Sequence, residues 1–209
     1  MIDNAIEFYY KAIELKDLIR AGYIQWKVDK ERIESVAEHV FACQILAIGL
    51  YSELKLDLDL GKVLEMLAIH ELEEIAIGDV TPLDDTPKSS LKKKAREEVQ
   101  KMIENLERFN ILMSLTDEYN KNETKEAQFS KAVDKLECVL QMKKYHDEER
   151  VSVLNATPSM LKNKKLKEYM DSGKYDLADI FFLFHMPSFQ QFGITEEYWF
   201  KTLKHFKIR

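Results

Sequence analysis

The chain has 209 residues, 45% of them hydrophobic, which is enough for one substantial core. Its formal net charge of −6 argues against a general nucleic-acid binder, and no apolar run approaches the roughly 20 residues that cross a bilayer. Acidic residues at the N-terminus stand where a signal peptide needs basic ones, and the two cysteines, Cys43 and Cys138, form no CxxC pattern. We therefore expect a cytoplasmic protein that binds neither a nucleic-acid polymer nor a membrane.

The composition favours helices over strands. Glycine and proline number only six and four, whereas Leu, Ile, Lys, Glu and Ala dominate. Apolar residues recur at helical spacing in most segments, and Gly78 opens a loop that is expected to run to residue 88. We expect an all-α fold in one domain, 1–209, with a motif-bearing core over about 18–145 and a helical extension over about 146–209. The predicted helices cover, in chain order, about 4–21, 35–54, 59–77, 90–109, 111–119, 125–145, 158–173, 176–184 and 196–206.

Several familiar catalytic motifs are missing from the sequence. The His-Glu-x-x-His motif of zinc proteases would need a second histidine at position 74, which is Glu74. No histidine has a glutamate three residues before it, so the Glu-x-x-His pairs of a di-iron bundle are absent. There is also no P-loop, no GxGxxG and no GxSxG.

A set of metal-binding residue types remains, on three predicted helices and next to their inward stripes. These residues are His39, the pair His70-Glu71, and Asp134. Adjacent helical residues diverge by about 100° around the axis, so His70 and Glu71 reach one ion only if it lies between their directions. Two imidazoles and two carboxylates suit a divalent transition metal such as Mn²⁺, Fe²⁺, Co²⁺ or Zn²⁺. Glu74 lies one turn beyond His70, where it can accept a proton from water.

The order of these residues resembles that of the HD-domain metal-dependent phosphohydrolases, which carry His…His-Asp…Asp. The chain looks like their compact branch, which includes the 5′-deoxynucleotidases, over about residues 18–145. The family usually has aspartate where this chain has Glu71. The matching stretches are Glu34-Ser-Val-Ala-Glu-His39, His70-Glu-Leu-Glu-Glu74 with Gly78-Asp-Val80, and Lys131-Ala-Val-Asp-Lys-Leu-Glu137.

The resemblance implies a role for each matching residue. It implies that one divalent metal is held by His39, His70, Glu71 and Asp134. It implies that Glu74 activates or orients the attacking water, and that Asp79 supports the site or the leaving-group oxygen.

The family also implies an arginine upstream of the first histidine that contacts the substrate phosphate, and an aromatic residue that meets the sugar. Arg20 and Tyr23 match these positions best, with tyrosine where tryptophan is common. Arg32 and Lys88 are the other candidate phosphate contacts. The resemblance implies a homodimer as well.

Three functional hypotheses follow. The first is a metal-dependent phosphohydrolase that uses a metal-activated water to cleave a small phosphomonoester, with a (deoxy)nucleoside 5′-monophosphate as the expected substrate. The alternative is a catalytically degenerate HD-fold module that binds a nucleotide or a protein. The third is an all-α interaction protein whose polar helix faces are merely solvated.

The extra methylene of Glu71 leaves three outcomes open. It displaces the carboxylate by about 1.5 Å relative to an aspartate. Glu71 then binds the metal directly, binds it through a water, or no longer supports metal binding. The presence of every other proposed site carboxylate favours direct ligation.

Overall fold

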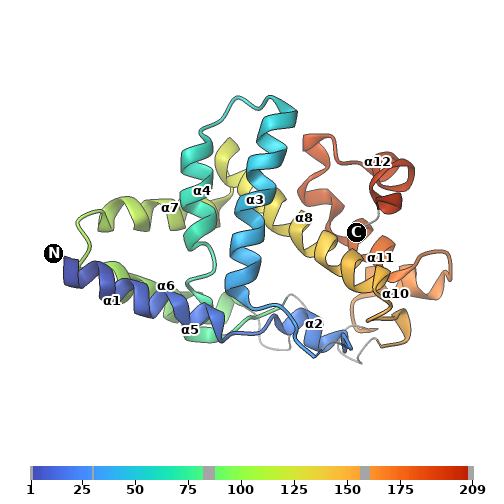
Figure 1. Cartoon of the computed structure of the whole chain (residues 1–209), viewed down its shortest axis with the longest axis horizontal. Coiled ribbons are helices and arrows are strands. Elements are labelled where there is room, and N and C mark those ends of the chain that lie inside the picture. Colours follow the sequence, from blue (N-terminus) through green and yellow to red (C-terminus); the bar gives the residue numbers. More distant parts are fainter. Residues whose placement is uncertain (1, 30, 82–87, 156–160, 207–209) are drawn as a thin grey trace. The chain divides into compact units, whose positions relative to one another are not determined.

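The computed structural model describes residues 2–29, 31–81, 88–155 and 161–206, with only the backbone described for 88–90 (Figure 1). Within these ranges every regular element is a helix, and one isolated antiparallel bridge joins Ile19 to Ser35. The all-α prediction is confirmed. None of the described helices combines the length and the apolar character that a membrane crossing requires.

The elements are, in chain order, α1 (Ile2–Ala12), η1 (Ile13–Lys16), α2 (Ala21–Gln25), α3 (Val36–Leu54), α4 (Leu60–Ile69), α5 (Glu74–Ile77), α6 (Lys88–Ile103), α7 (Phe109–Lys121), α8 (Lys125–Asp147), η2 (Val153–Asn155), α10 (Lys164–Asp171), α11 (Leu177–His185), η3 (Met186–Ser188), η4 (Gln190–Phe192), α12 (Glu196–Lys201) and η5 (Leu203–His205). The η elements are single 3₁₀ turns. The long helices α3 and α8 lie close to their predicted positions, as does α11.

The chain forms two compact units. Unit 1 comprises Met1–Arg20 and Glu34–Ser130, and unit 2 comprises Ala21–Ile33 and Lys131–Arg209. Helix α8 passes from unit 1 into unit 2 after Ser130. This division does not coincide with the predicted boundary near residue 145, and a single folding domain stays a prediction.

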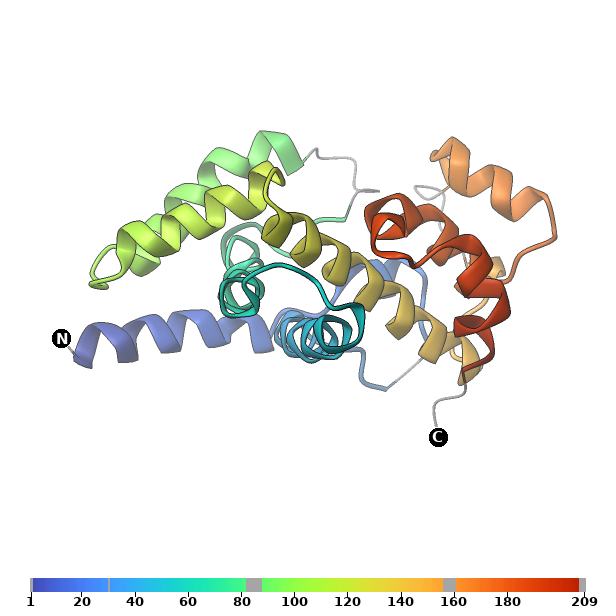
Figure 2. The same cartoon turned by 90° about the horizontal axis from the view of Figure 1, so that it is seen from above.

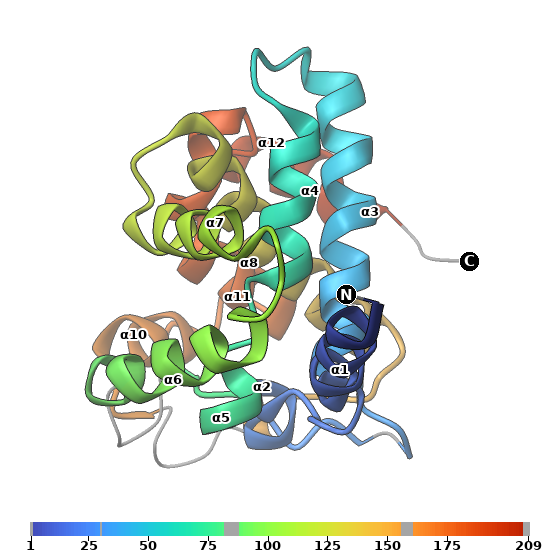
Figure 3. The same cartoon turned by 90° about the vertical axis from the view of Figure 1, so that its left-hand side faces the viewer.

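In unit 1, α3 and α4 form an antiparallel pair that runs side by side (Figures 1 and 3). Helices α6 and α7 pack alongside each other in the same unit, as Figure 2 shows. A buried apolar cluster joins elements from across the unit and is covered by partly buried side chains. Its members are Leu15, Val36, Leu72, Val99, Ile103 and Met113.

Helix α3 begins where the sequence predicts. Ser35 accepts a hydrogen bond from the Glu38 backbone N–H and donates its own N–H to Glu38 Oε2 at 2.8 Å, which is a complete capping box. The Val36 N–H donates to the Leu18 carbonyl and the Arg20 N–H to the Glu34 carbonyl, at 2.8 and 3.1 Å. These bonds hold the segment around Arg20 against the start of α3.

In unit 2, aromatic side chains bring distant segments together. Trp26 meets Phe181 edge-on, with ring centroids 5.5 Å apart, and Phe182 stacks on Trp199 at 4.5 Å. Helix α11 is capped by Asp176, whose side chain accepts from the Asp179 N–H at 2.9 Å. The segment 21–33 therefore packs with the C-terminal helices although more than 100 residues separate them in sequence.

Several predicted helix boundaries are wrong. The first predicted helix, 4–21, ends as a 3₁₀ turn at Lys16, because the chain then enters the Ile19–Ser35 bridge. The segment 22–32, which lies outside the predicted helices, contains most of α2. The predicted helix over 90–109 ends at Ile103, and the short helix over 111–119 is the longer α7. The predicted start at Thr157-Pro158 lies outside the described residues, and the described helix there, α10, is capped by Asn163.

The most consequential difference concerns the predicted helix 59–77. It is interrupted: α4 ends at Ile69, residues 70–73 form turns, and α5 begins at Glu74. Short-range bonds replace the helical ladder, with the Leu72 N–H donating to Ile69 and the Glu74 N–H to Glu71, at 3.2 and 2.9 Å. Gly78, with a φ of 77°, ends α5 as the sequence predicts.

Candidate metal centre

Two histidines of unit 1 face each other. His39 lies in the first turn of α3 and is fully buried, and His70 directly follows the end of α4. Their ring centroids are 5.6 Å apart. Because α3 and α4 are neighbouring antiparallel helices, residues 31 positions apart in the chain reach the same point.

The interruption after α4 brings Glu71 to the same place. Glu71 Oε1 lies 3.6 Å from His70 Nε2 and 3.7 Å from His39 Nε2. The helical estimate of a 100° divergence between His70 and Glu71 does not apply, because residues 70–73 are turns. The turn lets two adjacent side chains point at one position, whereas on a continuous helix they would diverge by about 100°.

The orientation of His70 suits a metal ligand. Its Nδ1 lies 2.8 Å from the Leu67 carbonyl oxygen, so Nδ1–H donates there and the lone pair of Nε2 faces His39 and Glu71. The ring of Tyr119, on α7, packs against His70 with centroids 5.3 Å apart. These contacts fix both the tautomer and the tilt of the imidazole.

The donor set fits a divalent transition metal. Metal bonds to histidine nitrogen and carboxylate oxygen are about 2.0–2.2 Å long, so two ligands of one tetrahedral ion lie about 3.3–3.5 Å apart. The 3.6 and 3.7 Å separations between Glu71 Oε1 and the two imidazole nitrogens are close to that spacing. Imidazole with carboxylate is the chemistry that Zn²⁺, Co²⁺, Fe²⁺ and Mn²⁺ share.

A cysteine also lies beside these histidines, although the sequence was searched for cysteines only in a CxxC pattern. Cys43 is buried, and its Sγ lies 3.6 Å from His39 Nε2. Donor atoms of His39, Cys43 and His70 all lie within 4.8 Å of one another. The available signal was the spacing, because residues i and i+4 share a helix face.

Arg20 and Asp79 stand next to this cluster in unit 1. Arg20 Nη1 lies 3.4 Å from Glu71 Oε1 and 3.6 Å from Asp79 Oδ1. The arginine side chain is only 12% exposed, so these ion pairs are shielded from water. Glu74, at the start of α5, is buried as well.

The remaining predicted site residues belong to unit 2 or are not described. Asp134 is buried on α8, with Lys135 Nζ 3.0 Å from its Oδ2. Tyr23 is a core residue whose hydroxyl donates to the Cys138 carbonyl at 3.3 Å. Arg32 is exposed. The side chain of Lys88 lies outside the described residues, and the roles of these four residues stay predictions.

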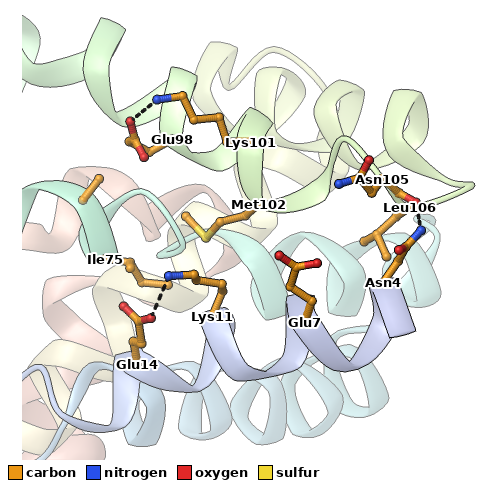
Figure 4. Close-up of a pocket in the computed structure, with 11 residues that line it drawn as sticks. Asn4, Glu7, Lys11, Glu14, Ile75, Glu98, Lys101, Met102, Asn105 and Leu106 are labelled. Carbon is orange, nitrogen blue, oxygen red and sulfur yellow. Dashed lines mark hydrogen bonds and ion pairs between the residues drawn. The ribbon is translucent and has the colours of Figure 1, made fainter. Parts of the chain in front are cut away.

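A separate pocket of about 300 Å³ lies among α1, α5 and α6 (Figure 4). Its wall groups already bind one another: Lys101 pairs with Glu98 at 2.6 Å and Lys11 with Glu14 at 3.4 Å. No predicted site residue lines this pocket. We therefore assign it no part in the chemistry of the metal centre.

Comparisons with known proteins identify the family of the chain. A family model described as an HD domain matches residues 12–172. The chain is 27% identical to the 5′-deoxynucleotidase HDDC2 of Bos taurus, over 85% of this chain and 80% of that protein. It is 29% identical to the 5′-deoxynucleotidase HDDC2 of Dictyostelium discoideum, over 94% and 98%. A solved structure, a conserved hypothetical protein from Pyrococcus furiosus, is 26% identical, with a TM-score of 0.56 over 80% of this chain and 97% of that one. This chain belongs to the HD-domain family.

Proposed function

We propose that this chain is a divalent-metal-dependent phosphohydrolase that cleaves a deoxynucleoside 5′-monophosphate. The observation that carries the proposal is the convergence of His39, His70 and Glu71 beside Arg20. Two relatives support it as well, because both are 5′-deoxynucleotidases and the chain matches them over 80% and 98% of their length. A homodimer in the cytoplasm is part of the same proposal.

His39, His70 and Glu71 would hold the metal, and we propose Asp134 as the fourth ligand on the basis of its place in the family motif. When bound, a divalent ion lowers the pKa of water and polarises phosphoryl oxygens. Mn²⁺, Fe²⁺, Co²⁺ and Zn²⁺ are the candidates.

Arg20 is the proposed phosphate contact. Its guanidinium presents N–H donors in a planar fork that suits the non-bridging oxygens of a phosphate, and it lies within 3.6 Å of Glu71 and Asp79. The two carboxylates hold the guanidinium in position before substrate arrives, which reduces the entropy lost on binding. Arg32 and Lys88 are the alternative cations, and Tyr23 is the proposed sugar contact.

Glu74 is the proposed proton acceptor. The turn that presents Glu71 also places Glu74 at the start of α5, where the side chain is buried. A carboxylate held in a shielded site takes the proton that the attacking water loses as it bonds to phosphorus. Asp79 would keep Arg20 oriented while negative charge develops on the leaving oxygen.

Phosphate release from a panel of deoxynucleoside monophosphates tests the proposal. The protein is stripped of metal and assayed with Mn²⁺, Co²⁺ or Zn²⁺ added back. We expect turnover with at least one ion, and a loss of about 100-fold or more in kcat/KM in Arg20→Met, because a charged donor to the reacting phosphate is removed.

Arg108→Met is the matched control, because Arg108 makes an exposed ion pair with Glu65 at 2.9 Å, and we expect its kinetics to be unchanged. Absence of turnover with every ion, together with no metal in elemental analysis, would contradict the proposal.

The glutamate at position 71 favours one further candidate, an HD-fold module that binds a nucleotide or a protein without hydrolysis. This candidate predicts calorimetric binding of a deoxynucleoside monophosphate to the metal-free protein, and no phosphate release. The phosphohydrolase predicts release on addition of metal, so the same samples separate the two.

A further inference from the structure

The outer face of α3 is apolar although it is open to solvent. Phe41, Ile45 and Ile48 recur at helical spacing and are 65%, 54% and 42% exposed. The opposite face of the same helix, which includes Cys43 and Ala47, is buried in the protein. Because a helix that is apolar all round is normally buried all round, the composition of α3 indicates that its outer face is covered in the working protein.

Gly49 lies on the same outer face of α3 and is exposed as well. A Cβ added at this position would meet no atom within 4 Å, so packing within the chain does not require a glycine here. Glycine in the interior of a helix is destabilising relative to alanine. Its bare backbone does allow another helix to approach α3 closely, which gives the residue a role on a covered surface.

A second exposed apolar surface lies on α1, in the same unit. Ile2, Ile6 and Tyr9 share one side of this helix, Tyr10 lies beside them, and all four are between 50% and 75% exposed. Phe8, on another side of α1, packs against the apolar core. Figures 2 and 3 show α1 and α3 along the same side of unit 1. We call these four side chains and the three on α3 the α1–α3 face.

The area of the α1–α3 face matches what a stable dimer needs. Large apolar and aromatic side chains present roughly 150–250 Å² each when fully exposed, so seven of them at 42–75% exposure present on the order of 800 Å². The largest apolar patch on a typical monomer is roughly 300–600 Å². Each partner of a standard protein–protein interface buries about 800 Å².

Charge favours a second copy of the chain as the occupant. The formal net charge of −6 makes two copies repel each other, so they associate most readily through a face that brings no like charges together. Residues 40–52 of α3 include no Asp, Glu, Lys or Arg. A basic partner would need acidic residues in this stretch, and an anionic membrane would need lysines or arginines there.

We propose that the α1–α3 face is the contact surface between two copies of this chain, related by a twofold axis, with the two α3 helices crossing near Gly49. The inference rests on the homodimer of the proposed function and names its surface. In a twofold contact the same face meets itself, so each apolar side chain is buried in both copies. Gly49 lets the two backbones approach, while Ile45 and Ile48 flank the crossing.

Sedimentation equilibrium of the full chain tests the surface. We expect a wild-type dimer at micromolar concentrations, and Ile45→Glu should weaken it at least about 100-fold, because the twofold axis places two charges in an apolar contact. Ile111→Glu is the matched control, because Ile111 is 49% exposed on α7, outside the α1–α3 face, and it should leave the dimer unchanged. A monomeric wild type, a dimer that survives in Ile45→Glu, or equal losses in the two variants overturns the inference.

Gly49→Leu gives a second readout, in which the direction of the change is informative. Leucine favours the helix and has space within the chain, so the variant should keep its helical circular dichroism. It should nevertheless weaken the dimer at least about tenfold, because the added side chain separates the crossing helices. Unchanged or tighter association in Gly49→Leu overturns the proposed crossing. If Ile45→Glu fails to fold, Gly49→Leu decides alone.

Other occupants and a failed activity give different results. Flotation of a monomeric wild type with phosphatidylcholine vesicles would assign the face to a membrane and overturn the inference. A dimer that Ile45→Glu disrupts, in a protein that releases no phosphate, supports the inference and overturns the proposed activity. Phosphate release from a protein whose dimer survives in Ile45→Glu does the reverse.

Discussion

Glu71 stands where the HD-domain family usually has aspartate, and its longer side chain determines what the carboxylate reaches. One oxygen lies within 3.7 Å of both His39 Nε2 and His70 Nε2 and within 3.4 Å of Arg20 Nη1. An aspartate on the same backbone would stop about 1.5 Å short of that point. Because residues 70–73 form turns, the added reach is directed at the histidines rather than away from them.

Metal affinity of Glu71 variants tests this assignment. Glu71→Ala should weaken binding by at least about tenfold, because a charged ligand is lost. Glu71→Asp should retain binding, because a carboxylate that stops about 1.5 Å short can still reach the ion through a water. Chelator competition measures both. Glu73→Ala is the control, since Glu73 contacts Asn120 on the exposed side at 3.3 Å. Equal affinity in Glu71→Ala and the parent would rule out the ligand role.

At the scale of the element, the sequence predicts α3 well and the helix that carries His70 poorly. The start of α3 has a strong local signal, because Ser35 and Glu38 form a capping box. The break after Ile69 has no such signal, since residues 70–73 include no glycine or proline. Leu72 is instead drawn into the apolar cluster with Leu15 and Val36, so tertiary packing overrides the helical periodicity.

The cap of α3 is expected to affect metal binding as well as stability. Ser35→Ala should cost about 1 kcal/mol of unfolding free energy and should also weaken metal binding, because His39 lies in the turn that the cap holds. Asn163→Ala removes the equivalent cap from α10 and should cost a similar amount without affecting the metal. Urea unfolding and chelator competition measure the two effects. Unchanged metal affinity in Ser35→Ala would show that the cap does not position His39.

At the scale of the whole molecule, the spacing of apolar residues predicts helices but not which segments pack together. The sequence indicates an all-α chain and the order of the site motifs, because both depend on local patterns. It does not indicate that the segment 21–33 packs with the C-terminal helices, because the Trp26–Phe181 contact joins residues 155 positions apart. The packing of the Tyr23 ring on Tyr145, within unit 2, has no local signal in the sequence either.

A charged network in unit 2 gives its stability a pH dependence. Burial opposes ionisation of Asp176, but the Asp179 backbone N–H, the Lys204 ammonium and His146 outweigh it, and together they hold the pKa of the Asp176 carboxyl below its ordinary value. Lys204 Nζ also lies 2.5 Å from Asp179 Oδ2, and Asp179 Oδ1 accepts from Trp199 Nε1 at 2.8 Å. Because the pKa of Asp176 is lower in the folded than in the unfolded state, its ionisation stabilises the fold at pH values above the unfolded pKa of about 3.9. This stabilisation is lost as the pH falls through the folded pKa.

Lys204→Met should therefore destabilise unit 2 most where the carboxylates are charged. We expect the unfolding free energy to fall by about 3 kcal/mol at pH 6, because a buried carboxylate loses its cation. At pH 3, where the carboxyls begin to protonate, the difference in unfolding free energy from wild type should be smaller. Both tryptophans, Trp26 and Trp199, belong to unit 2, so their fluorescence during urea unfolding reports on this unit. Lys201→Met removes an exposed pair with Glu197 and should change stability by no more than about 0.5 kcal/mol at either pH. A gap between Lys204→Met and wild type that stays constant from pH 6 to pH 3 would show that the network does not couple folding of unit 2 to protonation.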